Sequence, residues 1–219
     1  MTLQIYTISG SPYGWRATLA LAAKGLEHEI IILEASKKEQ KSDWYLKLNP
    51  KGTVPLLVDG DFAVRDSAAI VAYLDSKYPE PPLLGTSPEE AGLIWQTGNE
   101  FESELWPLLS SVTGPILRGK TRDDRDAALN TVKTIMSMFN DINSDLGGDA
   151  YLQGESLSAA DIYLMPMTQV WLRAVVRDAG ADAPLGLSSF EESCPNLAVW
   201  VARMESIPGY DDTYPAHWR

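Results

Sequence analysis

The sequence of 219 residues predicts a small α/β domain followed by an all-helical domain. Strand-like and helix-like patterns alternate through residues 3–77, and the proline-rich stretch 78–88 then interrupts them. Beyond that stretch, apolar residues recur every three or four positions, which is the spacing of one helix face and not of a strand. We therefore expect an N-terminal α/β domain over residues 1–80, a linker over 81–87 and a helical domain over 88–219.

The first part of the α/β domain has the pattern strand, helix, strand. Residues 3–8 alternate large apolar with polar side chains, which is typical of a half-buried strand. Residues 13–24 are rich in Ala and Leu and stop at Gly25, which predicts a helix. The β-branched segment 29–33 has the composition of a buried strand. Because a crossover of this length joins parallel strands, we expect the two strands to be parallel.

The second part of the α/β domain contains a short helical turn, two short strands and a helix, at residues 44–48, 56–58, 62–64 and 69–74. The turn residues Asp59-Gly60-Asp61 separate the two strands, which predicts an antiparallel hairpin. Asp66 or Ser67 has a side chain suited to cap the helix. Together with the parallel pair, this order predicts a mixed sheet whose last two strands are antiparallel.

The helical domain contains four segments with helical apolar spacing, at residues 88–111, 122–146, 158–178 and 195–205. Pro107 and Pro166 fall inside two of these segments. Because proline lacks a backbone N–H and its ring clashes with the preceding turn, we expect each proline to kink its helix or end it locally.

Composition argues against several classes of function. The formal net charge of −12 disfavours nucleic-acid binding, which needs clustered Lys and Arg. With Cys194 as the only cysteine, an intrachain disulfide and a cysteine metal cluster are impossible. His28 and His217 lie far apart in sequence, so a metal site has little support. No apolar run approaches the roughly 20 residues that span a bilayer, and no signal peptide is visible. We therefore expect no membrane association and a cytoplasmic location.

The turn between the first strand and the first helix is the strongest candidate for chemistry, since the sequence has no P-loop, G-x-S-x-G, G-x-G-x-x-G or C-x-x-C motif. Ser11 lies at the start of the helix, where free N–H groups and the helix dipole favour an anion such as a thiolate. Ser11 could equally serve only as the N-cap, with Pro12 in its favoured first position. Sequence pattern alone favours the cap.

Three further features lie on the same domain. Val54-Pro55 opens a strand, and a cis bond there would leave the Val54 N–H and C=O free to pair with an extended peptide ligand. An ordinary strand-opening proline is the alternative, and sequence pattern alone favours it. Asp66-Ser67 can bind an amino and carboxylate pair or simply cap a helix. Lys41 is a cation whose default place is the solvated surface.

Together these features resemble the cytosolic glutathione transferases over essentially the whole chain. The resemblance is carried by four segments in order, which are Ser11–Arg16 with its helix, the N-P-x-G-x-V-P segment Asn49–Pro55, the acidic-Ser helix start Asp66–Ile70, and Gly154 with Ser158–Asp161. The fourth segment is similar to the family's buried capping box. The resemblance implies a thioredoxin-like N-terminal domain (βαβαββα), an all-helical C-terminal domain and a homodimer.

The resemblance also implies site residues, with glutathione as the co-substrate. By that similarity the Ser11 hydroxyl activates the glutathione thiol, and Val54 pairs with the cysteinyl backbone beside a cis Pro55. Asp66 and Ser67 hold the γ-glutamyl end. Lys41 meets the glycyl carboxylate.

Two hydroxyls other than that of Ser11 remain candidates for the catalytic role. Tyr6 lies where tyrosine-type classes carry their catalytic hydroxyl, and Tyr13 is close in sequence. Omega-like and lambda-like members carry a cysteine in place of Ser11, so mixed-disulfide thiol transfer is disfavoured.

The expected second substrate is a small hydrophobic electrophile bound between the domains. Tyr13 and Trp15 are candidate substrate residues because they follow the catalytic turn, and Trp106, Trp171 and the tail 214–218 offer more aromatic surface. The Ser-x-x-x-Trp-Arg arrangement also resembles zeta-type members that isomerise maleylacetoacetate. Arg173, twelve residues after Asp161, lies near where those proteins carry a substrate-binding arginine. Isomerisation is therefore an alternative, and a non-catalytic partner-binding member is another.

Overall fold

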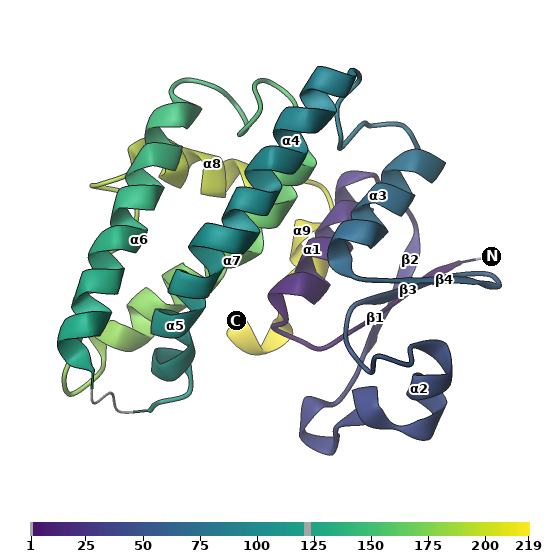
Figure 1. Cartoon of the computed structure of the whole chain (residues 1–219), viewed down its shortest axis with the longest axis horizontal. Coiled ribbons are helices and arrows are strands. Elements are labelled where there is room, and N and C mark those ends of the chain that lie inside the picture. Colours follow the sequence, from purple (N-terminus) through teal and green to yellow (C-terminus); the bar gives the residue numbers. More distant parts are fainter. Residues whose placement is uncertain (1, 121–123) are drawn as a thin grey trace. The chain divides into compact units, whose positions relative to one another are not determined.

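The computed structural model describes residues 2–120 and 124–219 and divides into two compact units (Figure 1). The first unit contains the chain up to Thr86 together with Glu205–Arg219, and the second contains Ser87–Met204. The predicted helical domain 88–219 includes residues 205–219, whereas the structure groups that segment with the first unit. The predicted domain ranges remain a prediction.

The first unit is built on a four-stranded mixed sheet with strand order β2-β1-β3-β4. The strands are β1 (Leu3–Thr7), β2 (His28–Ile32), β3 (Leu56–Asp59) and β4 (Phe62–Arg65). β1 and β2 are parallel, β3 is antiparallel to β1, and β3 and β4 form the antiparallel hairpin. The predicted mixed sheet with an antiparallel end is confirmed.

The helices of the first unit are α1 (Pro12–Ala23), α2 (Asp43–Leu48), α3 (Ser67–Lys77) and the short C-terminal α9 (Tyr210–Thr213). Three 3₁₀ turns accompany them, at Ala35–Lys37, Glu39–Lys41 and Ala216–Trp218. Helices α1 and α3 contact each other and the sheet. Tyr45 of α2 belongs to a separate buried cluster, against which Tyr6 and Val58 of the strands pack.

Strand β2 differs from its prediction as a buried strand. It lies at the edge of the sheet and pairs only with β1, and Ile32 is 51% exposed. The β-branched composition correctly indicated a strand, because β-branched side chains fit a pleated backbone. Composition does not encode the number of neighbours that a strand acquires, so the burial was wrong.

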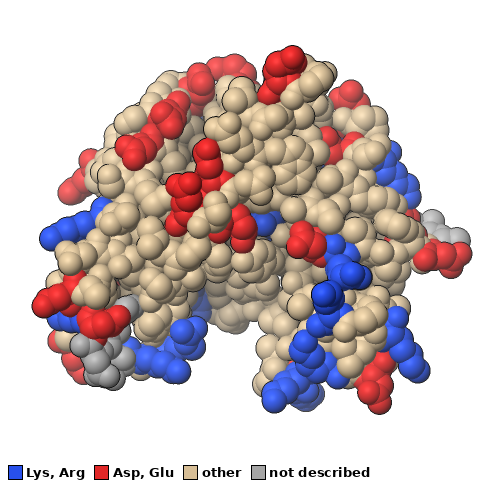
Figure 2. All heavy atoms as spheres, viewed as in Figure 1, with Lys and Arg blue, Asp and Glu red and all other residues tan. Residues whose placement is uncertain are grey.

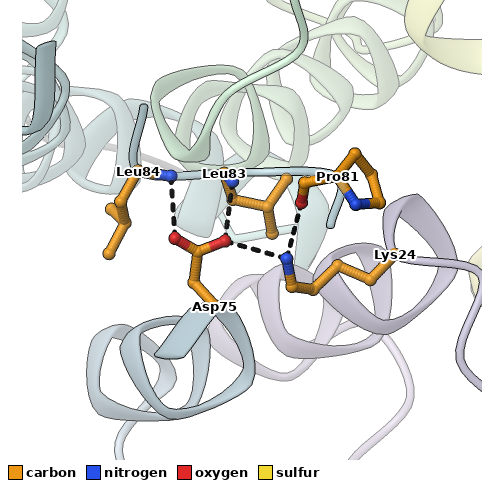
Figure 3. Close-up of polar contacts among 5 residues, drawn as sticks. All are labelled: Lys24, Asp75, Pro81, Leu83 and Leu84. Carbon is orange, nitrogen blue, oxygen red and sulfur yellow. Dashed lines mark hydrogen bonds and ion pairs between the residues drawn. The ribbon is translucent and has the colours of Figure 1, made fainter. Parts of the chain in front are cut away.

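A buried ion pair ties the end of α1 to α3 and to the segment after it (Figure 3). The Lys24 ammonium donates to Asp75 at 2.8 Å and to the Pro81 carbonyl at 2.6 Å, and the Lys24 side chain is fully buried. The Asp75 carboxylate also accepts from the backbone N–H groups of Leu83 at 2.7 Å and Leu84 at 3.2 Å. These contacts hold residues 81–84 against α1 and α3.

The second unit is helical. Its elements are α4 (Pro88–Glu100), a π-helical turn (Phe101–Leu105), α5 (Trp106–Leu117), α6 (Arg125–Leu146), α7 (Ala159–Ala179) and α8 (Pro195–Glu205), whose last residue belongs to the first unit. Residues 122 and 123 of the predicted segment 122–146 lie outside the described residues. Helix α7 is buried on all sides from Ala159 to Trp171, as expected for a central helix.

The two prolines act differently within their helices. The segment 88–111 changes from α to π geometry at Phe101–Leu105, just before Pro107 at the start of α5. Pro107 lacks the N–H that would bond the carbonyl four residues earlier, at Ser103, and Ser103 lies within the π turn. Helix α7 continues through Pro166 from Ala159 to Ala179, so Pro166 does not end it.

The capping box expected at Ser158 and Asp161 forms at the start of α7. The fully buried Asp161 carboxylate accepts from the backbone N–H groups of Ser158 and Leu152, from the Ser158 hydroxyl and from the Trp200 indole. Burial raises the pKa of Asp161, and these hydrogen bonds oppose that rise. The box therefore anchors α8 and the preceding loop to α7.

Within the described ranges, no helix is both long and apolar enough to cross a bilayer. A search of the same residues finds no group of three or more His, Cys, Asp or Glu side chains placed to hold a metal ion.

Candidate active site

The candidate site is built on a tight turn that joins β1 to α1. The Ser11 N–H donates to the Ile8 carbonyl at 2.9 Å, and Gly10 at the third position has φ of +81°. This is the arrangement of a type II turn, which needs a positive φ at that position and therefore favours glycine. The turn delivers Ser11 to the first position before the helix.

Ser11 caps α1 in the way that the sequence predicted. Its side-chain oxygen accepts from the Gly14 N–H at 3.2 Å, and Pro12 occupies the first helical turn. Because that oxygen is an acceptor in the cap, the hydroxyl hydrogen remains available for another acceptor. The cap and the anion-binding role are therefore compatible, and geometry does not force a choice between them.

The start of α3 lies beside the start of α1 through a buried contact. The Arg16 guanidinium, which is 3% exposed, donates from Nη1 to the Ser67 hydroxyl at 3.1 Å. Ser67 is also buried, at 4% exposure. Two helix N-termini and a buried cation thus come together, an arrangement that favours a bound anion.

Asp66 caps α3 and carries an unusual backbone. Its carboxylate accepts from the N–H groups of Ala68 at 2.9 Å and Ala69 at 3.4 Å. Its φ of 76° and ψ of 128° lie in a region that residues with a Cβ rarely occupy. The side chain is exposed, so the carboxylate can also contact a ligand.

Val54-Pro55 is a cis peptide bond, as the family resemblance implied. The Val54 side chain packs on the same cluster as Ile8, which precedes the Ser11 turn. Antiparallel pairing of Tyr6 with Leu56 brings the C-terminal end of β1 and the start of β3 to the same end of the sheet. The backbone groups of Val54 make no hydrogen bond among the described residues.

Lys41 lies against the segment that leads to Val54. Its ammonium donates to the Lys51 carbonyl at 3.1 Å, and Gly52, with φ of +57°, leaves the space that the Lys41 side chain occupies. Asn49 and Tyr45 both donate to the Thr53 carbonyl at 2.7 Å. These bonds fix the strand entrance.

The alternative hydroxyls have other surroundings. The Tyr6 ring lies 5.9 Å from the Tyr45 ring and 6.2 Å from the Trp44 ring, on the side of the sheet that α2 covers. Tyr13 is 36% exposed, with the Arg16 guanidinium 5.4 Å from its ring centre. Tyr13 belongs to the first turn of α1, next to Ser11, whereas Tyr6 lies in β1. Among these three candidates, the hydroxyl that caps α1 is that of Ser11.

The candidate substrate residues belong to different units. Trp15 is 3% exposed, and its indole donates to the Thr213 hydroxyl at 2.9 Å, so it packs inside the first unit. Arg173 is half-buried on α7 of the second unit. Their substrate roles, like that of Tyr13, remain predictions.

Sequence reasoning missed the contact between His217 and Ser9. His217 Nδ1 lies 2.8 Å from the Ser9 hydroxyl oxygen, although the two residues are 208 positions apart. The sequence flagged the aromatic tail 214–218 only as a surface for a second substrate. No local pattern connects a chain terminus with a turn so far away.

Comparison with known proteins agrees with this geometry. Residues 5–82 match the N-terminal domain model of glutathione S-transferases, and residues 105–208 match the C-terminal domain model. Glutathione S-transferase Z2 of Arabidopsis thaliana is 34% identical over 215 residues, covering 97% of this chain and 91% of the relative. A zeta class glutathione S-transferase of Euphorbia esula is 32% identical over 166 residues, covering 75% of this chain and 73% of the relative.

The fold comparison points the same way. The crystal structure of a glutathione S-transferase from the Antarctic clam Laternula elliptica superimposes with a TM-score of 0.82 at 27% identity, covering 100% of this chain and 94% of the other. With two matched domain models and relatives above 30% identity over most of their length, the chain belongs to the glutathione S-transferase family.

Proposed function

We propose that this transferase binds glutathione in the first unit and activates its thiol as a thiolate through the Ser11 hydroxyl. The observation that carries the proposal is the position of Ser11 at the N-terminus of α1. Its oxygen accepts from Gly14 N–H at 3.2 Å and its hydrogen is left to donate. A backbone N–H that donates into a hydroxyl oxygen polarises the O–H bond and strengthens it as a donor.

The remaining assignments would hold a tripeptide across the end of the sheet where β1 finishes and β3 begins. The free N–H and C=O of Val54, beside cis Pro55, would pair with the cysteinyl backbone. The Asp66 carboxylate and the Ser67 hydroxyl would hold the amino and carboxylate groups of the γ-glutamyl end. Lys41 would meet the glycyl carboxylate at the other end.

Charge supports an anionic ligand at this site. Although the chain carries a net charge of −12, Lys and Arg side chains gather around α2 on the face shown in Figure 2. The exposed lysines of this part of the chain are Lys37, Lys38, Lys41, Lys47 and Lys51. Glutathione has two carboxylates and one ammonium, and gains a further negative charge as a thiolate. A local positive potential therefore favours its capture.

Ser11 would accelerate the reaction by increasing the fraction of bound glutathione that is present as thiolate. Lowering the thiol pKa from about 8.5 to about 6.5 corresponds to about 2.7 kcal/mol. At neutral pH this shift converts a few per cent of thiolate into most of the population. The thiolate would then attack a small hydrophobic electrophile.

Titration calorimetry of the protein with glutathione, in two buffers of different ionisation enthalpy, tests this proposal. We expect binding with release of most of one proton near neutral pH, since the thiol ionises on the protein. Binding without proton release would refute thiolate activation. Absence of binding at millimolar glutathione would leave a family member that binds another partner.

A second candidate function is glutathione-dependent isomerisation of an unsaturated diacid such as maleylacetoacetate. It is favoured by relatives that carry the zeta class name and by Arg173 on α7, a cation that suits a carboxylate. If Arg173→Gln lowers isomerase turnover and spares conjugation of a neutral electrophile, isomerisation is the better description. A homodimer is also part of the proposal, and sedimentation equilibrium tests it.

A further inference from the structure

The C-terminal segment Tyr210–Arg219 docks on the start of α1. The Trp15 indole donates to the Thr213 hydroxyl at 2.9 Å, and that hydroxyl donates to the Tyr210 carbonyl at 2.7 Å. The Trp15 ring lies 5.3 Å from the Tyr214 ring and 5.6 Å from the Trp218 ring, both edge-on. Such edge contacts between the buried Trp15 ring and two half-buried rings stabilise a fixed arrangement. The tail is thus held at a defined place next to the Ser11 turn.

From that place, His217 contacts two residues of the turn. Its Nδ1 lies 2.8 Å from the Ser9 hydroxyl oxygen. A Cβ placed on Gly10 would lie only 3.0 Å from His217 Cε1 and 3.2 Å from Trp218 Nε1, so the tail packs directly on the glycine. Ser9 and Gly10 are the two central residues of the turn that ends at Ser11. The imidazole therefore restrains the turn that orients Ser11, although it does not contact Ser11 itself.

Packing contributes little on one flank of this turn. A cavity of about 220 Å³ lies between the tail and the turn, lined among others by Ser9, Ser11, Trp15, Ile32 and Pro215. Atoms that border a cavity lack contacts on that side and are restrained mainly by their remaining hydrogen bonds. Ser9 lines this cavity and also contacts the solvent-exposed His217, so the Ser9–His217 bond ties the turn to the tail in addition to the packing on Gly10.

We propose that His217 is a positioning residue for thiol activation, acting through the Ser9 hydroxyl to hold the turn that presents Ser11. This inference rests on the proposed function of Ser11. The Ser11 hydroxyl must point its hydrogen at a sulfur, and displacements well below 1 Å weaken such a bond. His217 supplies the lateral restraint and takes no part in the chemistry.

The test measures the pKa of protein-bound glutathione from the ultraviolet absorbance of its thiolate, together with kcat/KM as a function of pH. We expect His217→Ala and Ser9→Ala each to raise that pKa by about 0.5 to 1 unit, a three- to tenfold lower thiolate-to-thiol ratio. kcat/KM should fall by the same factor at pH values below the thiol pKa and return to the wild-type value above it. A general structural loss would lower the rate at every pH.

Three comparisons sharpen the test. His217→Asn keeps a hydrogen-bonding group near the Nδ1 position and should stay within about twofold of wild type. The double variant Ser9→Ala/His217→Ala should resemble either single variant, because both remove one interaction. His28→Asn is the matched control. His28 is the first residue of β2, and its Nδ1 lies 2.7 Å from the carbonyl oxygen of Leu26, so this histidine does not contact the Ser11 turn.

The outcomes separate this inference from the function on which it rests. If wild-type protein binds glutathione without forming thiolate, the proposed function of Ser11 fails whatever the His217 variants show. If wild type forms thiolate and His217→Ala leaves the pKa unchanged, only the positioning role is overturned. Additive effects of the two single substitutions would likewise exclude action through Ser9.

Discussion

At the scale of single residues, Ser11 combines a structural and a chemical task in one hydroxyl. Its oxygen caps α1 through Gly14, and its hydrogen is left for a ligand. We expect Ser11→Ala to lower turnover by about one to three orders of magnitude, because one preorganised donor to an anion is lost. Glutathione affinity should change little. Steady-state kinetics and calorimetry on the same variant measure the two quantities.

The cap itself requires a control, because Ser11→Ala also removes it at a cost of about 1 kcal/mol. Ser11→Gly removes the hydroxyl while weakening the cap by only a few tenths of a kcal/mol. Both variants should lose the same activity. Should turnover instead survive in both and vanish in Tyr6→Phe or Tyr13→Phe, the hydroxyl belongs to a tyrosine.

Asp66 provides a second residue-scale prediction, since its charge and its cap can be separated. Asp66→Asn keeps a side-chain oxygen for the N–H groups of Ala68 and Ala69 and removes the negative charge. Asparagine also tolerates positive φ better than most residues. We expect nearly unchanged stability and glutathione affinity lower by about tenfold, the loss typical of a charged hydrogen bond. Equal affinity by calorimetry would remove Asp66 from the binding site.

At the scale of elements, the sequence predicted strands and helices well because their signals are local. Alternation in residues 3–8 and the alanine-rich run before Gly25 specify backbone conformation within a few residues. Burial of β2 was predicted wrongly, because an edge position depends on which strands pair. The buried Arg16–Ser67 bond was also invisible, since it joins two elements 51 residues apart.

Some residues of the candidate site could likewise be predicted from local sequence, and others could not. Ser11, Asp66 and Pro55 could be identified because each sits at a helix start or strand start that local sequence marks. His217 could not, since its role depends on where the C-terminal segment docks. Residues that start helices and strands can therefore be identified as site residues from the sequence. Contacts between segments that are distant in sequence can be identified only from the tertiary structure.

The Lys24–Asp75 ion pair joins two helices of the first unit, and its contribution to the free energy of unfolding can be predicted. Asp75→Asn would leave the fully buried Lys24 ammonium without its counter-charge. Loss of one partner from a buried pair destabilises by about 3–5 kcal/mol. We expect the urea concentration at the midpoint of unfolding to fall by the amount that corresponds to this loss of stability. The matched control is Asp59→Asn, which breaks the ion pair of Asp59 with the 42% exposed Lys77 and should cause a much smaller loss. Similar losses in both variants would contradict this account.

At the scale of the whole molecule, the chain passes between its two compact units twice. The first passage is at residues 86–87, and the second is at 204–205, inside α8. Only the last residue of α8 crosses the second boundary, so the helix itself adds little coupling. The first unit is discontinuous, however, and if residues 87–204 unfold, docking of its C-terminal segment must close a long flexible loop at a cost in entropy. We therefore expect the two units to unfold together.

Cys194 in the second unit reports that unfolding. It is fully buried, its thiol donates to Asn140 at 3.3 Å, and burial raises its pKa, so little thiolate is present in the native protein at neutral pH. Alkylation of this single cysteine should therefore require opening of the fold. A glutathione derivative methylated at sulfur would bind the first unit without reacting with the label.

With that ligand in excess, we expect Cys194 labelling to slow by a factor approaching 1 + [L]/Kd, about a hundredfold at a hundred times Kd. The reason is linkage, because a ligand that binds only the native first unit suppresses every opening in which that unit unfolds. Labelling is followed by mass spectrometry under conditions where reclosing outpaces alkylation. A rate independent of ligand would mean that the second unit opens alone. Such a result would leave the site proposals untouched, since all their residues except Arg173 belong to the first unit.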